Sequence, residues 1–132
     1  MLDYTNEFSF VLKPSSIQNG GIGVFATHAI KSGTKLMLNK EGGESRMVDP
    51  DYIPEALKHF CIVLQNGKLK APREFNHLWI VWYLNHSKYP NAELNQQENN
   101  YFAIKDIQEG EEILINYNAF NEPAGAKQDF YG

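Results

Sequence analysis

The sequence predicts one domain of mainly β structure, with short strands and one or two short helices. A chain of 132 residues is the size of a single domain with a single core. Its apolar segments are short, and turns rich in Gly, Pro and Asn separate them at close intervals, as is typical of small sheets. Apolar residues recur at helical spacing over one longer stretch only, between residues 74 and 85.

The first third of the chain predicts strands and turns. Residues 8–17 read as a strand that runs into a Pro-Ser-Ser turn, and the glycines within residues 20–23 form a flexible break. Residues 24–38 hold two short apolar segments split by Gly33, with no stripe at helical spacing. We therefore expect β structure there, with a turn at residues 31–34.

The middle third predicts two helices and a hairpin. Asp51 is expected to cap a short helix over residues 53–60. The Asn66-Gly67 pair between β-compatible flanks is a strong hairpin signal. A second helix is expected over residues 74–85, because apolar side chains at i, i+3, i+4, i+7 and i+8 would form one buried aromatic face: Phe75, Leu78, Trp79, Trp82 and Tyr83.

The last third returns to short strands. They are expected over residues 92–94, 101–104 and 112–117, separated by Asn-rich turns and by a turn at Gly110. Residues 118–132 are irregular.

Composition is typical of a soluble globular protein. The chain is 42% hydrophobic and has no apolar stretch near the ~20 residues that a bilayer span needs. Its N-terminus carries an acid and no apolar segment, so we expect no targeting segment. Cys61 is the only cysteine, which excludes an intramolecular disulfide. We expect a reducing intracellular compartment, the cytoplasm ahead of the nucleus.

Charge argues against general phosphate binding. The net charge is −4, and no direct nucleic-acid partner is expected. One local basic group is interpreted as a solvated face: Lys58, Lys68, Lys70 and Arg73. No metal is assigned, because three histidines show no ligand spacing beyond a weak His59-x-Cys61 pair: His28, His59 and His77.

Three segments place glycine or polar residues where elements end. In GGIGVFA, Gly21 and Gly23 would let a ligand approach the main chain, although a Gly-x-Gly taken alone is more often a plain turn. The interpretation as a dinucleotide-binding loop is excluded, because the third glycine of that motif is missing and strands, rather than a helix, follow. In Asn85-His86-Ser87 the structural reading is an amide helix cap with a hydrogen-bonded imidazole. EGEEILINYN is a strand that delivers Tyr117, either a surface tyrosine or a functional one.

In this order, the motifs GxGVFA, NHSxxPN and GEEhxxxY resemble those of the SET domain. NHSxxPN followed at this spacing by the Glu-Glu pair and the Tyr is the most specific part. The resemblance implies a β-clip-like fold of small curled sheets over residues 8–117, followed by a tail, residues 118–132, that is available to close the active site. In this fold the NHS segment threads beneath the loop that carries the Tyr, as a pseudoknot.

The resemblance also implies an activity, the S-adenosylmethionine-dependent methylation of a lysine in a protein or peptide tail. It implies that Ile22 and Gly23 offer backbone groups to the methionine part of the cofactor. Asn85 and the backbone of His86 would hold the polar end of the cofactor, and Tyr117 would supply the hydroxyl of the active site.

The sequence departs from the family pattern at several positions. Asn116 stands where the family usually carries Asp, and Lys88 replaces a frequent Cys. With no Cys-rich tail for a zinc-bound lid, Phe120 and Tyr131 are candidates to wall the channel, or they simply anchor the terminus. Ile115 stands where many relatives have Phe or Tyr and is a further channel candidate. The number of methyl groups added to the lysine therefore cannot be predicted from the sequence.

Other readings stay open. A SET-like module that binds a peptide or cofactor without chemistry is favoured by Asn116, whereas the presence of all motif residues favours an enzyme. A basic-patch nucleic-acid binder is disfavoured by the acidic total. A second subunit could replace the missing lid, so a symmetric homodimer is a hypothesis.

Overall fold

A computed structural model describes residues 4–38, 45–58, 61–98 and 100–120, with only the backbone described for residues 119 and 120. The strands in these ranges are β1 (Phe10–Pro14), β2 (Ile22–Ala26), β3 (Lys35–Leu36), β4 (Ser45–Val48), β5 (Ile62–Val63), β6 (Leu69–Pro72), β7 (Asn85–His86), β8 (Ala92–Asn95), β9 (Asn100–Ala103) and β10 (Leu114–Ile115). The helices are α1 (Glu55–Lys58) and the 3₁₀ turns η1 (Pro50–Tyr52), η2 (Ile80–Tyr83) and η3 (Tyr117–Phe120). The predicted mainly β fold of small sheets is therefore confirmed.

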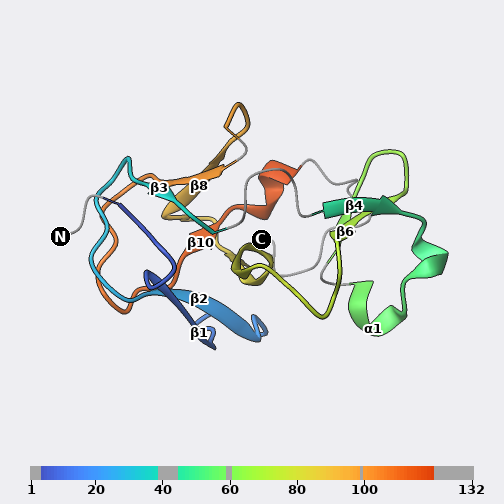
Figure 1. Ribbon diagram of the computed structural model, residues 1–132, viewed down its shortest axis with the longest axis horizontal. Coiled ribbons are helices and arrows are strands. Elements are labelled where there is room, and N and C mark those ends of the chain that lie inside the picture. The colour runs from blue at the N-terminus through green and yellow to red at the C-terminus, as the bar shows by residue number, and fades with distance from the viewer. Residues whose placement is uncertain (1–3, 39–44, 59–60, 99, 121–132) are drawn as a thin grey trace.

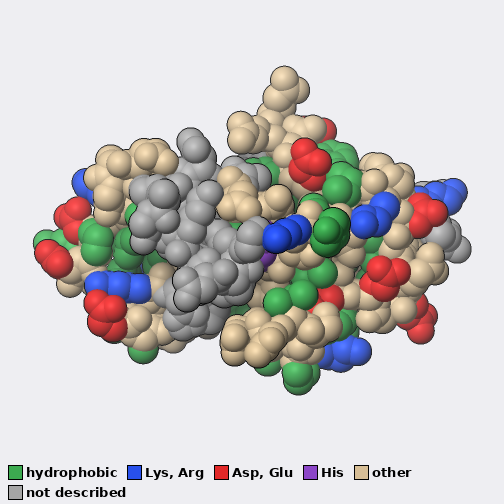
Figure 2. All heavy atoms as spheres, turned by 180° about the vertical axis from the view of Figure 1, so that it is seen from behind, with side chains coloured by type: hydrophobic (Ala, Val, Ile, Leu, Met, Phe, Trp, Pro, Cys, Tyr) green, Lys and Arg blue, Asp and Glu red, His purple; other side chains and the backbone are tan. Residues whose placement is uncertain are grey.

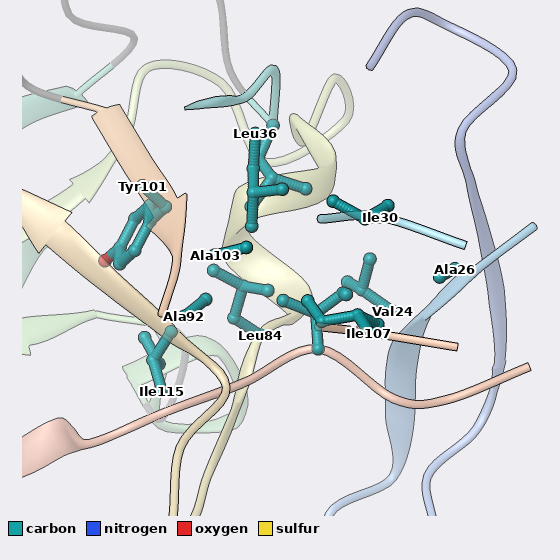
Figure 3. Close-up of a cluster of buried hydrophobic side chains, with 12 residues drawn as sticks. Val24, Ala26, Ile30, Leu36, Leu84, Ala92, Tyr101, Ala103, Ile107 and Ile115 are labelled. Atoms are coloured by element: carbon teal, nitrogen blue, oxygen red, sulfur yellow. The ribbon is translucent and has the colours of Figure 1, made fainter. Parts of the chain in front are cut away.

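Three sheets surround the main core, on the left of Figure 1. Strands β1 and β2 pair antiparallel, β3, β9 and β8 form an antiparallel sheet in that order, and β10 pairs parallel with β7. Their apolar sides meet in one cluster of buried side chains (Figure 3): Val24, Ala26, Ile30, Leu36, Leu38, Leu84, Ala92, Tyr101, Ala103, Ile107, Ile113 and Ile115. The core thus sits directly beneath the β7–β10 pair.

The turn predicted at residues 31–34 joins β2 to β3. The Thr34 N–H donates to the Lys31 carbonyl (3.1 Å), and Gly33 takes a φ of +89°. A residue with a Cβ rarely adopts that φ, so glycine is required here. The expectation of two strands with a turn between them is confirmed.

A second, smaller core lies in residues 45–75, on the right of Figure 1. Strands β4, β6 and β5 form an antiparallel sheet in that order. Leu69 and Ala71 of β6 point inward and Lys70 points out, and the inward side packs against Ile53 and Cys61. The expectation of a single core is therefore wrong, because this segment buries an apolar side of its own.

The predicted hairpin and first helix lie in this smaller part. Gly67 has a φ of +85° between β5 and β6, which confirms the Asn-Gly turn. Helix α1 covers four of the residues predicted, and residues 59 and 60 lie outside the described ranges. Asp51 does not cap α1, because it lies within η1.

The predicted helix over residues 74–85 is wrong. Only η2 forms a helical turn, and Trp79 and Leu84 on either side of it have extended backbones. The Val81 N–H donates to the Leu38 carbonyl (3.1 Å) across the core. Aromatic and β-branched residues are weak helix formers, so this tertiary hydrogen bond and the burial of Leu84 prevail over the spacing pattern.

Charged side chains are interspersed on the surface. On the face seen in Figure 2, Lys and Arg side chains alternate with Asp and Glu side chains among the described residues. Within the predicted basic group, Lys58 pairs with Glu55 (2.6 Å) and Lys68 lies 4.0 Å from Asp49. Such exposed pairs contribute little to stability. No helix within the described ranges is long and apolar enough to cross a bilayer.

Candidate functional site

Two segments far apart in the sequence lie side by side at the β7–β10 pair. Leu114 is in register with Asn85, and Ile115 is in register with His86. The Ser87 N–H donates to the Ile115 carbonyl (2.9 Å), which extends the pairing beyond β7. The motif resemblance implies this contact between the NHS segment and the segment that carries the Tyr.

Asn91 clamps the segment that carries the Tyr. Its side-chain Nδ2 donates to the Glu112 carbonyl, and its Oδ1 accepts from the Leu114 N–H, both at 2.8 Å. The Asn91 side chain is buried, and its backbone N–H also donates to the Leu114 carbonyl (3.1 Å). The Asn91 side chain therefore supplies two hydrogen bonds to the backbone of residues 112 and 114, and these bonds fix the start of β10.

His86 positions Tyr117. The Tyr117 N–H donates to Nδ1 of His86 (2.9 Å), and the two ring centroids lie 5.4 Å apart. Because Nδ1 accepts this bond, a neutral His86 carries its proton on Nε2. The Tyr117 hydroxyl donates to the Leu84 carbonyl, so its oxygen keeps lone pairs that can accept from another group.

Glu112 is a buried carboxylate that accepts four hydrogen bonds. Oε1 accepts from the Ser16 N–H (2.8 Å) and hydroxyl (2.6 Å), and Oε2 accepts from the Ser15 hydroxyl (2.7 Å) and from Nδ2 of Asn85 (3.1 Å). Burial alone would raise the pKa of this carboxyl, but the bonds from Ser16, Ser15 and Asn85 prevail and hold the pKa below its ordinary value. Glu112 therefore stays ionised at neutral pH.

Gly23 lies against this carboxylate. A Cβ added to Gly23 would lie 2.2 Å from Oε2 of Glu112, closer than atoms can pack. The space on the Cβ side of Gly23 is thus filled by the side chain of Glu112, and the approach of a ligand to the Gly23 backbone stays a prediction. Gly21 has a φ of +65°, so its lack of a side chain serves the turn.

A pocket of about 230 Å³ lies beside β10. Its walls are mostly apolar, and Glu93 is the one charged residue among the described residues that line it. Burial raises the pKa of Tyr101, one of the lining residues, to about 12, so this phenol stays neutral. The lining residues are Pro90, Ala92, Glu93, Leu94, Tyr101, Ile115 and Asn116.

The structure brings most of the predicted site residues into contact. Asn85 donates to the Ile22 carbonyl (3.1 Å) and lies beside Gly23, and the bond from Tyr117 to His86 continues the series. Two channel candidates lie elsewhere: Tyr131 is outside the described residues, and the Phe120 side chain is not described. Ile115 is buried in the core cluster and contributes to the pocket.

Sequence reasoning missed two residues of this site. Glu112 was visible only as one of a Glu-Glu pair, and Asn91 only as part of a Pro-Asn turn. The sequence offers one signal for Glu112, its position directly before the buried Ile113. A carboxylate that close to an apolar core needs hydrogen-bond partners, which suggests a polar site there. In the described ranges, no three His, Cys, Asp or Glu side chains gather closely enough to hold a metal ion.

One family model matches most of this chain, and solved structures share its fold. The model of the SET domain matches residues 21–118 of the chain. A candidate histone methyltransferase of Plasmodium falciparum has a similar structure, with a TM-score of 0.51 and 24% identity over 85% of this chain and 95% of that one. No curated protein matches the sequence.

Two larger assemblies contain a similar fold. A humanized Polycomb Repressive Complex 2 of Chaetomium thermophilum bound to the inhibitor GSK126 matches with a TM-score of 0.57 and 24% identity over 86% of this chain. The ctPRC2 complex in an autoinhibited conformation bound to S-adenosylmethionine matches with a TM-score of 0.55 and 22% identity over 87% of this chain. This chain spans only 15% and 16% of those two chains, so the likeness concerns the fold of one part of them.

Proposed function

The chain belongs to the SET-domain family, and from this premise we propose that it is an S-adenosylmethionine-dependent protein-lysine N-methyltransferase. One observation carries the proposal. One hydrogen bond joins Asn85 to Ile22 and another joins Tyr117 to His86, and Asn85 and His86 are consecutive residues of β7, so the residues expected to hold cofactor and substrate form one unit.

The Asn85 amide fits the amino end of this cofactor. Both N–H groups of its Nδ2 are used, one on the Ile22 carbonyl and one on Glu112, and both partners are acceptors. The oxygen and nitrogen of the amide are therefore assigned by their surroundings. Oδ1 remains as an acceptor, which suits an ammonium group. The cofactor, when bound, supplies an activated methyl group.

The lysine must reach the site without its charge. Its ordinary pKa of ~10.4 leaves roughly one amine in 2,500 neutral at pH 7, a free-energy gap of about 4.6 kcal/mol. Dry apolar walls lower that pKa by desolvation. We propose that the lysine channel is the pocket beside β10, because Leu94 and Ile115 line it and it reaches Asn116, next to Tyr117 in the chain. Glu93 in the same lining favours the charged amine, so desolvation must outweigh its effect.

Tyr117 orients the amine. Its hydroxyl proton points to the Leu84 carbonyl, so the oxygen can accept a hydrogen bond from the lysine nitrogen. A phenol with an ordinary pKa near 10 is a poor base at neutral pH, and we assign the departing proton to water. The bond from its own N–H to His86 keeps the ring in place.

Incubation with labelled S-adenosylmethionine and a panel of lysine-bearing peptides, histone tails included, tests the proposal. We expect methyl transfer by the wild type, and a loss of most turnover with retained cofactor binding in Tyr117→Phe. Tyr89→Phe is the matched control, because it removes the same hydroxyl from a side chain that is 81% exposed. Cofactor binding without transfer to any peptide would instead favour the binding module that Asn116, in place of the usual Asp, suggests.

A further inference from the structure

Glu112 is the buried acid of this site, and among the described residues it has no cationic partner. A buried carboxylate without partners is strongly unfavourable, and this one is offset entirely by neutral donors: two hydroxyls, one backbone N–H and one side-chain amide. Those donors come from the loop after β1 and from β7, so the carboxylate connects three separate parts of the chain.

The carboxylate decides how the Asn85 amide is oriented. If the amide were flipped, Oδ1 would face both the Ile22 carbonyl and Oε2 of Glu112 at 3.1 Å, three acceptors without a proton among them. With Glu112 ionised, only the observed orientation is satisfied. The Asn85 oxygen then points away from both partners.

The carboxylate also decides which residue can stand at position 23. The 2.2 Å approach of Oε2 to a Cβ placed on Gly23, and 2.8 Å of Cδ, leaves no room for any side chain. The same Cβ would lie 3.3 Å from Nδ2 of Asn85. Gly23, Asn85 and Glu112 are therefore packed as one interlocked group.

We propose that Glu112 is a positioning residue for the amino group of the cofactor: it holds the Asn85 amide so that Oδ1 faces the cofactor, and position 23 is glycine to make room for it. Glu112 acts through Asn85 and does not touch the cofactor. This inference rests on the proposed function for the identity of the ligand.

Glu112→Gln tests the orientation. With its oxygen on the Ser16 N–H, the new amide would point its own N–H₂ at Nδ2 of Asn85, two donors facing each other, whereas a flipped Asn85 amide would set Oδ1 against the Ile22 carbonyl, two acceptors facing each other. Neither orientation of Asn85 is then fully satisfied, so Oδ1 would no longer be held toward the cofactor. Calorimetric titration would use two ligands, S-adenosylhomocysteine and the analogue that lacks only its α-amino group. We expect roughly a tenfold loss of affinity for the first ligand and a change of no more than about twofold for the second.

Glu109→Gln is the matched control, since it removes the same charge from an exposed side chain in the preceding turn, and it should bind both ligands as the wild type does. An unchanged affinity of Glu112→Gln for S-adenosylhomocysteine would overturn the proposal. An equal loss for both ligands would overturn it too, because it would show a general structural role. A wild type that binds neither ligand would reject the proposed function rather than the interlocked group.

The packing is tested on the ligand-free protein. Gly23→Ala should lower the melting temperature of the wild type by several degrees. The same substitution in a Glu112→Asp background should lower it by less than half as much, because the shorter side chain withdraws the oxygen from the added methyl group. Equal decreases in the two backgrounds would show that the space at Gly23 is not reserved for Glu112.

Discussion

Replacing Asn91 with Ala should destabilise the protein more than any other single change of a polar residue in the NHSxxPN motif. The substitution leaves the Glu112 carbonyl and the Leu114 N–H without their 2.8 Å partners in a buried part of the chain. A buried group left unsatisfied costs about 1–3 kcal/mol. Two such groups predict a decrease of about 2–6 kcal/mol, a large share of the ~5–15 kcal/mol that a domain of this kind has.

Urea unfolding followed by circular dichroism measures this difference. Asn95→Ala is the control, because Asn95 is exposed and its side chain accepts one local bond, from the Glu98 N–H. It should stay within about 0.5 kcal/mol of the wild type. If Asn91→Ala loses less than about 1 kcal/mol at an unchanged urea dependence, the amide does not clamp β10 and the reasoning fails.

Three further predictions concern other groups. The depressed pKa of Glu112 means that its stabilisation is complete above the ordinary value of 4.5 and is lost as the pH falls through the folded pKa. The urea midpoint of the wild type should therefore fall more steeply below about pH 4.5 than that of Glu112→Gln, and parallel curves would contradict this. Ile113→Ala, at a side chain with 0% exposure, should cost about 2–5 kcal/mol in the same unfolding assay; a loss under about 1 kcal/mol would show that the core refills the space. Burial raises the pKa of the Cys61 thiol against the opposing effect of Arg46, so a disulfide reagent should modify the native protein roughly tenfold more slowly than the unfolded protein, and equal rates would contradict the burial.

The elements that the sequence predicts correctly are those set by local chemistry. Gly33 and Gly67 have positive φ values in the turns predicted for them, because turn geometry depends on the few residues that form it. The strands around these turns follow from alternation. The long-range pairing of β7 with β10 follows from the motif resemblance alone, since no local pattern specifies a partner that distant.

The failures have a common cause. The aromatic spacing over residues 74–85 fits a helix, but the hydrogen bond from Val81 to Leu38 and the burial of Leu84 are tertiary and leave no trace in a local pattern. The reason for a glycine at position 23 was missed for the same reason, since the side chain that fills the space on its Cβ side belongs to Glu112. A local sequence pattern shows which residue types are present, but it does not show which distant residues each of them contacts.

The bonds between the Ser15–Ser16 loop and Glu112 also bear on how the protein is made. Ser15 and Glu112 are separated by 97 residues, and Asn85 and Glu112 by 27. Chains emerge from the ribosome N-terminus first, so the loop and Asn85 are exposed long before their acceptor has been synthesised. A nascent chain halted before Glu112 can form its hairpins but not the hydrogen bonds that Glu112 accepts. Formation of the site should therefore be a late, slow event in folding, as expected when distant segments must find each other.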